Sequence, residues 1–358
     1  MLPVNVFIWD NLAALLLACA ALTWAARRAL VRQTLTPALA LVGALAIAVL
    51  LWRHGFHTKA VGFETFVAQP TERVDFHARS EAMEFTRAAH AAEPGRGFGL
   101  EGNFFPGWNP AYALETIHGP DALVNPFLRD LITASGVDRQ WNWRLYARPA
   151  TVNTVRPFFD VLNVRWYFNL PGKEPLSDPT LKLVKSADLD VFESPSAWPR
   201  AFFTDRVAGY DEPADFVAQI RSGDGRPFAA LQNPDFATHA ALTQLKGDLP
   251  TRSVAAATHY QLTENSTAFD VRATGPGVIV LSEALWPDDF RVEVNGRKRP
   301  VLRLNHAFKG VAVDAAGDYH VTFSYWPKNF SLLLSLSGLS AFLLAASFFI
   351  ARRRPRAA

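Results

Sequence analysis

Hydrophobic and polar residues alternate strictly in the last part of the chain. Residues 319–325 carry an apolar side chain at every second position, and residues 290–294 follow the same rule. A period of two predicts β-strands with one buried and one exposed face. Asn295-Gly296 follows the second stretch directly. Both central residues of a type I′ turn need positive φ, so Asn-Gly predicts a tight hairpin at this point.

The middle of the chain mixes helical and extended patterns. Helical spacing and end signals predict helices at 79–92, 126–135 and 213–222. Residues 158–168 are apolar and aromatic, which predicts a helix end followed by a buried strand, and residues 181–193 alternate as a pair of strands. Further strands are predicted at 254–262 and 267–273. Mixed elements of this kind predict an α/β or α+β layer that leads into an antiparallel region.

Three long apolar stretches lie near the ends of the chain, at about residues 7–26, 35–52 and 330–351. About 20 apolar residues suffice to cross a bilayer, so each stretch predicts a transmembrane helix. Arginines cluster at 27–32, between the first two stretches, and at 352–356, after the last. The positive-inside rule predicts that both clusters are cytoplasmic and that residues 55–328 lie outside. A signal peptide is the alternative for the first stretch, although it lacks a basic start.

These patterns together predict the fold class and the domains. The predicted fold class is a membrane protein with three transmembrane α-helices, an extracytoplasmic α/β region and a C-terminal antiparallel β-sandwich. The predicted domains are 1–54 (two transmembrane helices with an Arg-rich cytoplasmic loop), 55–200 (α/β region), 201–327 (β-sandwich-like domain), 328–351 (transmembrane helix) and 352–358 (cytoplasmic basic tail).

The charge and the cysteine content of the chain exclude several classes of function. The net charge of +3 does not indicate a nucleic-acid-binding surface, so we expect no nucleic-acid partner. Cys19 is the only cysteine, which excludes disulfides within the chain and the usual Cys-based zinc sites. The sequence contains no G-x-S-x-G, Walker loop or dinucleotide fingerprint. We therefore predict no catalytic residue and no cofactor.

Four basic residues surround the predicted hairpin, namely Arg291, Arg297, Lys298 and Arg299, and Arg303 and Lys309 add to the local charge. Guanidinium forks suit phosphate oxygens, and a domain held beside a bilayer meets phosphate headgroups. The first four therefore predict a weak phosphate or lipid site. The alternative is an ordinary solvated edge whose charges discourage strand addition.

Two further groups of residues carry weaker signals. Trp141 and Trp143 share a face if their segment is extended, and with Trp108 they predict a sugar-stacking surface; domain packing is the alternative. Asp188 and Asp190 form a D-x-D pattern that can hold a divalent cation, although solvated strand positions explain it equally simply. We predict no metal site, with these two aspartates as weak candidates.

Several segments, taken in order, resemble a known family. They are 101–123, 160–167 (DVLNVRWY), 189–203 (LDVFESPSAWPRAFF) and 281–325. Together they resemble the C-terminal part of bacterial YfhO-type membrane proteins, which are related to C-superfamily glycosyltransferases that use lipid-linked sugars. Phe290 and Asp289 depart from the family pattern, which usually has Trp and Gly at these positions. The resemblance also implies an upstream loop with an acidic catalytic residue, which this chain lacks.

The resemblance implies a function and a location. The implied function is an extracytoplasmic lid or acceptor-binding part in cell-envelope polysaccharide or lipid-linked sugar transfer. A non-catalytic membrane-anchored scaffold, or a glycan- or lipid-binding envelope protein, is the alternative. The expected partners are the lipid bilayer, a lipid-linked sugar or envelope polysaccharide, and a separate multi-pass transferase subunit. The expected location is the bacterial inner membrane, with the N-terminus and the large domain outside and the C-terminus cytoplasmic.

Overall fold

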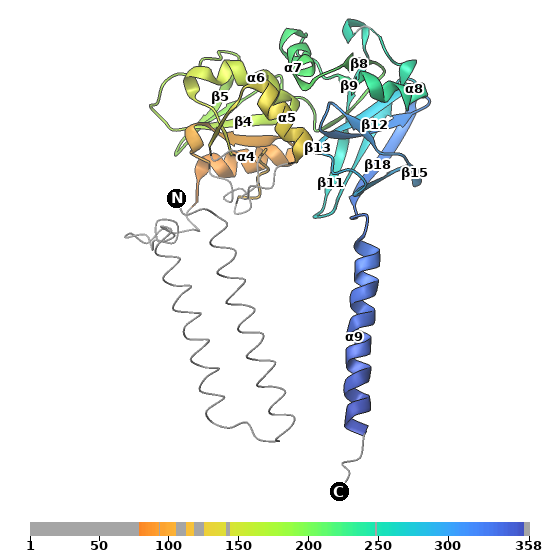
Figure 1. Cartoon of the computed structure of the whole chain (residues 1–358). Helices are drawn as coiled ribbons and strands as arrows, with labels where there is room; N and C mark the ends of the chain where they lie inside the picture. Colours follow the sequence, from red (N-terminus) through yellow and green to blue (C-terminus); the bar gives the residue numbers. More distant parts are fainter. Residues whose placement is uncertain are drawn as a thin grey trace, which may run out of the picture. The chain divides into compact units, whose positions relative to one another are not determined.

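The computed structural model describes residues 79–353 except 93, 105–111, 118–124, 141–143 and 248 (Figure 1). These residues belong to one compact unit, Arg79–Ala358. The first two predicted spans, with the arginines between them, and the basic tail from residue 354 lie outside the described residues.

A mixed four-stranded sheet opens the described part of the chain. Its strand order is β1-β4-β6-β5, with β1 (Arg96–Gly99), β4 (Val164–Asn169), β5 (Lys182–Ser186) and β6 (Asp190–Glu193). β1 and β4 run parallel, and β6 is antiparallel to both of its neighbours. The predicted strand pair at 181–193 is confirmed.

Four helices accompany the strands, namely α4 (Glu81–Ala92), α5 (Pro126–Ser135), α6 (Val152–Val161) and α7 (Pro213–Ser222). α5 begins at a proline after Asn125, whose side chain accepts a hydrogen bond from the Leu128 N–H, and it ends at Gly136 in the left-handed region. α7 likewise begins at a proline and carries a reciprocal cap between Glu212 and Asp215. The predicted helices at 126–135 and 213–222 are confirmed.

Short elements connect these helices and strands. Two-stranded sheets join β2 (Asp138–Gln140) with β3 (Arg144–Tyr146), and β8 (Val207–Tyr210) with β9 (Ala229–Gln232). The short helical turns are η1 (Leu100–Gly102), η2 (Pro149–Thr151), η3 (Asn233–Ala237), α8 (Ala240–Thr243) and η4 (Leu249–Thr251).

Two five-stranded antiparallel sheets make up most of the remainder. The first has the order β10-β7-β13-β17-β16, with β7 (Ala201–Thr204), β10 (Val254–Ala256), β13 (Gly277–Ala284), β16 (Leu302–Leu304) and β17 (Phe308–Val313). The second has the order β11-β12-β18-β14-β15, with β11 (Thr258–Leu262), β12 (Ser266–Ala273), β14 (Phe290–Val294), β15 (Arg297–Arg299) and β18 (Gly317–Tyr325).

The inner faces of these two sheets share a hydrophobic core. Phe203 and Ile279 of the β13 sheet belong to the same buried cluster as Phe269, Val321 and Phe323 of the β18 sheet. Alternation explains the partition, because every second residue of a strand points to the same face. In β18, Val321 and Phe323 are buried, whereas Thr322 between them is partly exposed.

The predicted hairpin at Asn295-Gly296 is confirmed. Val294 pairs with Arg297 across the turn, and the two central residues have φ values of 49° and 73°. This is the backbone conformation that a type I′ turn requires. The turn brings Lys298 and Arg299 back alongside β14.

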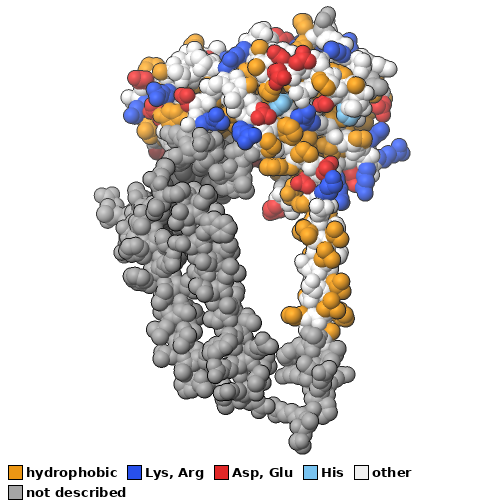
Figure 2. Space-filling model, in the orientation of Figure 1, with side chains coloured by type: hydrophobic (Ala, Val, Ile, Leu, Met, Phe, Trp, Pro, Cys, Tyr) orange, Lys and Arg blue, Asp and Glu red, His pale blue; other side chains and the backbone are white. Residues whose placement is uncertain are grey.

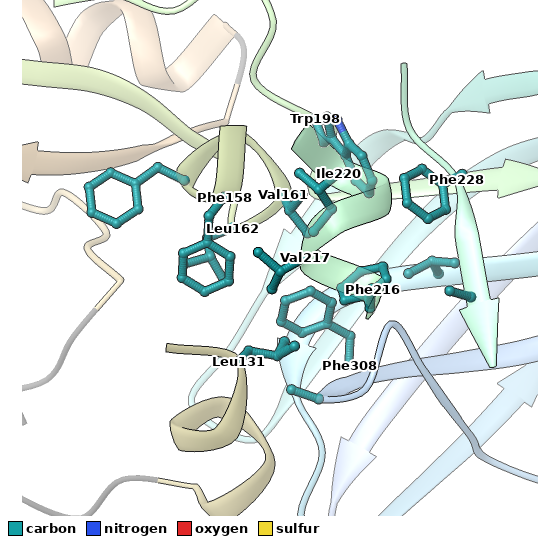
Figure 3. Close-up of a cluster of buried hydrophobic side chains, with 14 of the residues drawn as sticks. Leu131, Phe158, Val161, Leu162, Trp198, Phe216, Val217, Ile220, Phe228 and Phe308 are labelled. Carbon is teal, nitrogen blue, oxygen red and sulfur yellow. The ribbon is translucent and has the colours of Figure 1, made fainter. Parts of the chain in front are cut away.

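A second, larger core joins the helices to the β13 sheet (Figure 3). Side chains of α5, α6 and α7 meet residues of β7, β13 and β17 in one continuous cluster. The labelled members are Leu131, Phe158, Val161, Leu162, Trp198, Phe216, Val217, Ile220, Phe228 and Phe308. The helical part and the β-rich part are thus joined by a common core.

The third predicted transmembrane span falls on α9 (Phe330–Arg353). Its described side chains are largely hydrophobic (Figure 2). Across the residues that the structure describes, no helix combines the length and the apolar character needed to cross a membrane. The predicted fold class with three transmembrane helices is therefore contradicted, and the described residues form a β-rich fold with several antiparallel sheets.

Candidate functional site

Three of the four predicted phosphate-binding residues line one pocket. Arg291, Lys298 and Arg299 surround a cavity of about 520 Å³ together with Arg303. We call this pocket the basic groove; its other lining residues include Phe127, Asp235 and Asp288. Arg297 is exposed near the hairpin tip and does not line the groove.

Strand pairing explains how these residues come together. Across β14 and β15, Val292 pairs with Arg299 and Glu293 pairs with Lys298. Arg291 precedes this pair on the same hairpin, so residues that lie several positions apart become neighbours. Arg303 reaches the groove from the neighbouring β16.

The cations of the groove differ in how they are held. Arg303 donates to Gln232 Oε1 at 2.7 Å and to Asp235 Oδ2 at 3.1 Å, and its guanidinium carbon lies 4.5 Å from the centroid of the Phe127 ring. Arg299 lies 3.4 Å from an Asp314 carboxylate oxygen. These contacts orient two of the four guanidinium or ammonium groups before any ligand arrives.

The charged groups of Arg291 and Lys298 are held by fewer contacts. The guanidinium carbon of Arg291 lies 5.4 Å from the centroid of the Trp326 ring. Within the described range, neither Arg291 nor Lys298 makes an ion pair with a carboxylate. Asp288, one of the two carboxylates that line the groove, is itself bound by Lys328 Nζ at 2.7 Å. The groove therefore holds an excess of positive charge.

A second pocket contains a buried network of charges. We call it the charged pocket; it has a volume of about 440 Å³ and is lined by Glu115, Arg200, Glu283 and Lys309, with Trp286 and Tyr325 among its aromatic residues. Phe290 lines both this pocket and the basic groove. The two sites are therefore neighbours on either side of β14.

Glu283 is the centre of the network. One of its oxygens accepts from Arg200 Nη2 at 2.6 Å and from Thr267 Oγ1 at 2.9 Å, and the other accepts from Lys309 Nζ at 2.8 Å. Arg200 also pairs with Glu115. Arg200, Glu283 and Lys309 have side chains exposed by only 8%, 17% and 3%, so their contacts are shielded from water.

Burial and charge act in opposite directions on these groups. Burial raises the pKa of Glu283, but the charges of Lys309 and Arg200 outweigh it and hold that pKa at about 2. Burial lowers the pKa of Lys309, and together with the charges of Arg200 and Arg96 it outweighs the raising effect of Glu283. Nearby charges outweigh burial for Glu283 but not for Lys309, because Glu283 has two cations beside it whereas Lys309 has one anion.

Three adjacent strands bring the network together. Arg200 immediately precedes β7, Glu283 belongs to β13, and Lys309 belongs to β17. Leu281 of β13 pairs with Ala201 on one side and with Lys309 on the other. Arg200 and Glu283 are not among the site residues predicted from the sequence. The sequence signal that could have identified Glu283 is its position within the otherwise apolar strand GVIVLSEA. A charged residue in such a strand is rarely buried without a partner.

The other predicted site residues do not join either pocket. Trp108, Trp141 and Trp143 lie outside the described residues. Asp190 accepts from Ser186 Oγ at 2.5 Å, and Asp188 accepts from the Ala82 N–H at 3.0 Å at the start of α4. Burial raises the pKa of Asp188, but hydrogen bonds from Ser80 and the Ala82 N–H outweigh it and lower this pKa. Each aspartate thus has a local structural role.

No group of three or more His, Cys, Asp or Glu side chains that could hold a metal ion occurs in the part of the chain that the structure describes. The D-x-D pattern at Asp188 and Asp190 therefore receives no further ligand from described residues.

Comparison with known proteins adds no further assignment. No family model matches this chain, and neither a curated protein nor a solved structure matches it. The resemblance to YfhO-type proteins stays a prediction that rests on the sequence segments alone.

Proposed function

We propose that this chain is a binding protein without catalytic residues of its own, and that the basic groove takes a phosphate-bearing ligand. The observation that carries this proposal is the convergence of Arg291, Lys298, Arg299 and Arg303 on one cavity. Phosphate suits the cavity because guanidinium groups form paired, charge-assisted hydrogen bonds with its oxygens.

The charged residues that line the basic groove favour an anion over a neutral ligand. Four cations and two carboxylates, Asp235 and Asp288, line the groove, and Lys328 already binds one of these carboxylates. A ligand with one or two negative charges would balance the remaining excess. Arg303 and Arg299 are oriented by Asp235 and Asp314, so less side-chain entropy is lost on binding.

Two sources can supply the phosphate, the headgroup of an anionic lipid and a sugar phosphate. The resemblance of residues 281–325 to YfhO-type proteins supports a lipid-linked sugar of the bacterial envelope, with the chain as the acceptor-binding part and a separate transferase subunit supplying the chemistry. A scaffold without a ligand is the rival proposal, and the cation excess in the groove speaks against it.

Binding of the full chain to three probes tests this proposal and separates the sources. The probes are vesicles of phosphatidylglycerol, vesicles of phosphatidylcholine and soluble glucose 1-phosphate. Preference for the anionic vesicles with no response to glucose 1-phosphate assigns the lipid headgroup. Saturable binding of glucose 1-phosphate assigns the sugar phosphate. Equal binding to both vesicles and no binding of glucose 1-phosphate would contradict the proposal.

Charge reversal within one hairpin provides a matched control. The double variant Lys298→Glu, Arg299→Glu should weaken phosphate binding by at least about tenfold, because it removes two charged donors from the groove. Arg297→Glu reverses a charge on the same strand but outside the groove, so we expect a much smaller effect. Equal losses per reversed charge would indicate unspecific attraction to the hairpin and would exclude a defined site.

A further inference from the structure

A buried histidine lies beside the basic groove without lining it. His306 is 4% exposed and belongs to the turn between β16 and β17. Its ring meets the Phe127 ring edge-on, with centroids 5.9 Å apart. Phe127 lines the groove, and the guanidinium of Arg303 lies over its ring. One aromatic side chain thus contacts both the imidazole and a cation of the groove.

The turn that carries His306 is fixed by hydrogen bonds. Asn305 Oδ1 accepts from the Ala230 N–H at 2.6 Å, and Asn305 Nδ2 donates to Phe228 O at 3.0 Å. The Ala307 N–H donates to Asn305 O at 2.8 Å. Moving the imidazole out of its buried position would therefore require these hydrogen bonds to break.

The two ring nitrogens of His306 have different surroundings. Nδ1 lies 3.1 Å from the Tyr210 hydroxyl oxygen, whereas Nε2 is buried and has no hydrogen-bond partner among the described residues. A carboxylate oxygen of Asp130 lies 3.6 Å from Nε2, and the Asp130 side chain is 46% exposed. A protonated imidazole donates from both nitrogens. Protonation would therefore give Nε2 a proton that Asp130 can accept after a small side-chain rotation.

The charged and titratable groups around the imidazole come from the elements packed against it. They are Asp130 of α5, Tyr210 of β8, Glu212 at the start of α7 and Arg303 of β16. Burial lowers the pKa of His306, and the charge of Arg303 lowers it further. Asp130 and Glu212 raise this pKa, but by less. His306 is therefore neutral at neutral pH and takes up a proton in acid.

Repulsion between His306 and Arg303 couples the imidazole to any anion in the groove. An anion bound at Arg303 offsets the positive charge that disfavours the protonated ring. Binding of the anion therefore favours protonation of His306, and by thermodynamic linkage protonation tightens anion binding by the same factor. Burial preserves the coupling, because dissolved ions screen buried charges less than exposed ones.

We propose that His306 is a proton sensor for the basic groove: in acid the protonated imidazole pairs with Asp130 and strengthens the binding of anions beside Arg303. The sensor rests on the proposed phosphate site and adds regulation by pH to it. His239 lines the groove itself and is the alternative sensor that the test must separate.

Anion binding by the purified full chain at about pH 7.5 and about pH 5 tests the sensor. The probes are sulfate and vesicles of phosphatidylglycerol, whose charges are constant in this range, unlike a phosphate monoester, which titrates near pH 6. We expect binding to be at least about fivefold tighter at the lower pH. Failure of both probes to bind at either pH would contradict the phosphate site, whereas equal affinity at both pH values would overturn the sensor alone.

Two substitutions identify the groups that act in the sensor. His306→Asn removes the imidazole and suits the left-handed backbone there (φ 66°), and it should abolish most of the gain in affinity at the lower pH. Asp130→Asn leaves the buried ring in place and removes the carboxylate that favours its protonated form, so the gain should shrink. Because Asp130 is partly exposed, its variant tests the sensor even if His306→Asn does not fold. An undiminished gain in Asp130→Asn would overturn the pairing.

Two other histidines provide controls. His259→Asn is matched, because His259 also has a left-handed backbone (φ 53°), is 79% exposed and lines another pocket. It should keep the full gain, and a loss there would indicate an effect of overall charge and exclude a sensor at His306. If the gain persists in His306→Asn and disappears in His239→Asn, His239 is the sensor and the role of His306 is likewise excluded.

Discussion

At the scale of single residues, Glu283 shows how a buried charge is tolerated. Moving a carboxylate out of water is costly, and the cost is offset only when partners of good geometry surround it. Arg200 and Lys309 supply those partners from the two strands that flank β13, and Thr267 supplies one from β12 of the other sheet. Removing any one of them leaves a buried group with unmet hydrogen bonds, so the network acts as a unit.

The pKa of Glu283 makes stability depend on pH. Its value of about 2 in the folded chain lies below its ordinary value of 4.5, so Glu283 stabilises the fold above about pH 4.5 and loses this contribution as the pH falls toward 2. The full contribution is about 3 kcal/mol. Urea unfolding at several pH values between about 6 and 2 should show the loss.

A substitution tests whether Glu283 causes the loss of stability at low pH. Glu283→Gln should lower stability at neutral pH and flatten the acid part of the profile, because the titrating carboxylate is gone. Glu264→Gln is the control: Glu264 is exposed and lines the same pocket without a described ion pair. A profile for Glu283→Gln that stays as steep as that of the original chain would show that other carboxylates cause the acid sensitivity.

At the scale of elements, the β14–β15 hairpin depends on its turn. Asn295 and Gly296 both have positive φ, and an added Cβ at Gly296 meets no atom within 4 Å. Any cost of a larger residue at Gly296 therefore comes from the backbone conformation and not from crowding. This turn also sets the pairing register of β14 and β15, which places Lys298 and Arg299 beside Arg291.

Gly296→Ala should destabilise the fold by about 1–2 kcal/mol, the usual cost of a left-handed conformation for a residue with a Cβ. It should also weaken phosphate binding, since the hairpin carries three of the basic residues that line the groove. Gly275→Ala is the matched control, because a Cβ there also meets no atom within 4 Å and its backbone is outside the left-handed region. Equal unfolding free energies for both variants would refute the role of the turn.

Asn125 links two elements through one side chain. It caps α5 by accepting from the Leu128 N–H at 3.1 Å, and its amide donates to Leu285 O beside Trp286. Asn125→Ala should destabilise the fold by about 1–2 kcal/mol through loss of the cap. It should also speed hydrogen exchange at the Leu285 N–H, because the loop that carries Trp286 loses an anchor.

A second variant separates the two roles of Asn125. Asn125→Ser retains an oxygen that can cap α5 but has no amide to reach Leu285 O. We expect most of the stability to return while hydrogen exchange at the Leu285 N–H stays fast. Recovery of both quantities together would show that the contact with Leu285 does not anchor this loop.

At the scale of the whole described unit, one core crosses the boundary between the helical part and the β13 sheet. Phe308 of β17 is 2% exposed and belongs to the same cluster as Leu131, Phe158 and Phe216 of the three helices (Figure 3). Arg96 of β1 adds a polar link through its bond to Ser282 O. These contacts predict that the two parts unfold together.

Phe308→Ala should destabilise the unit by about 3–5 kcal/mol, because it removes a buried ring and leaves a cavity. Hydrogen exchange should accelerate by a similar factor in β4 of the helical part and in β13 of the β-rich part. Leu183→Ala, at a side chain 55% exposed, is the control and should change neither. Acceleration confined to β13 would show that the parts unfold independently.

The sequence by itself determined the features that depend on near neighbours. Period-two alternation located β14 and β18, Asn295-Gly296 set the turn, and proline with Asn125 marked the start of α5. Each of these signals lies within a few residues of the element that it specifies. The clustering of Arg291, Lys298 and Arg299 was predictable for the same reason, since one tight turn joins them.

Only the tertiary structure decided which distant residues meet. Arg200, Glu283 and Lys309 come together because β7, β13 and β17 are neighbours in a sheet, and no local pattern specifies that strand order. Hydropathy alone likewise predicted a membrane span at residues 330–351, whereas no helix among the described residues combines the length and apolar character that a span needs. Local rules fix the conformation of a segment, whereas long-range pairing and burial depend on free energies summed over the whole unit, so the charged pocket became visible only in the folded chain.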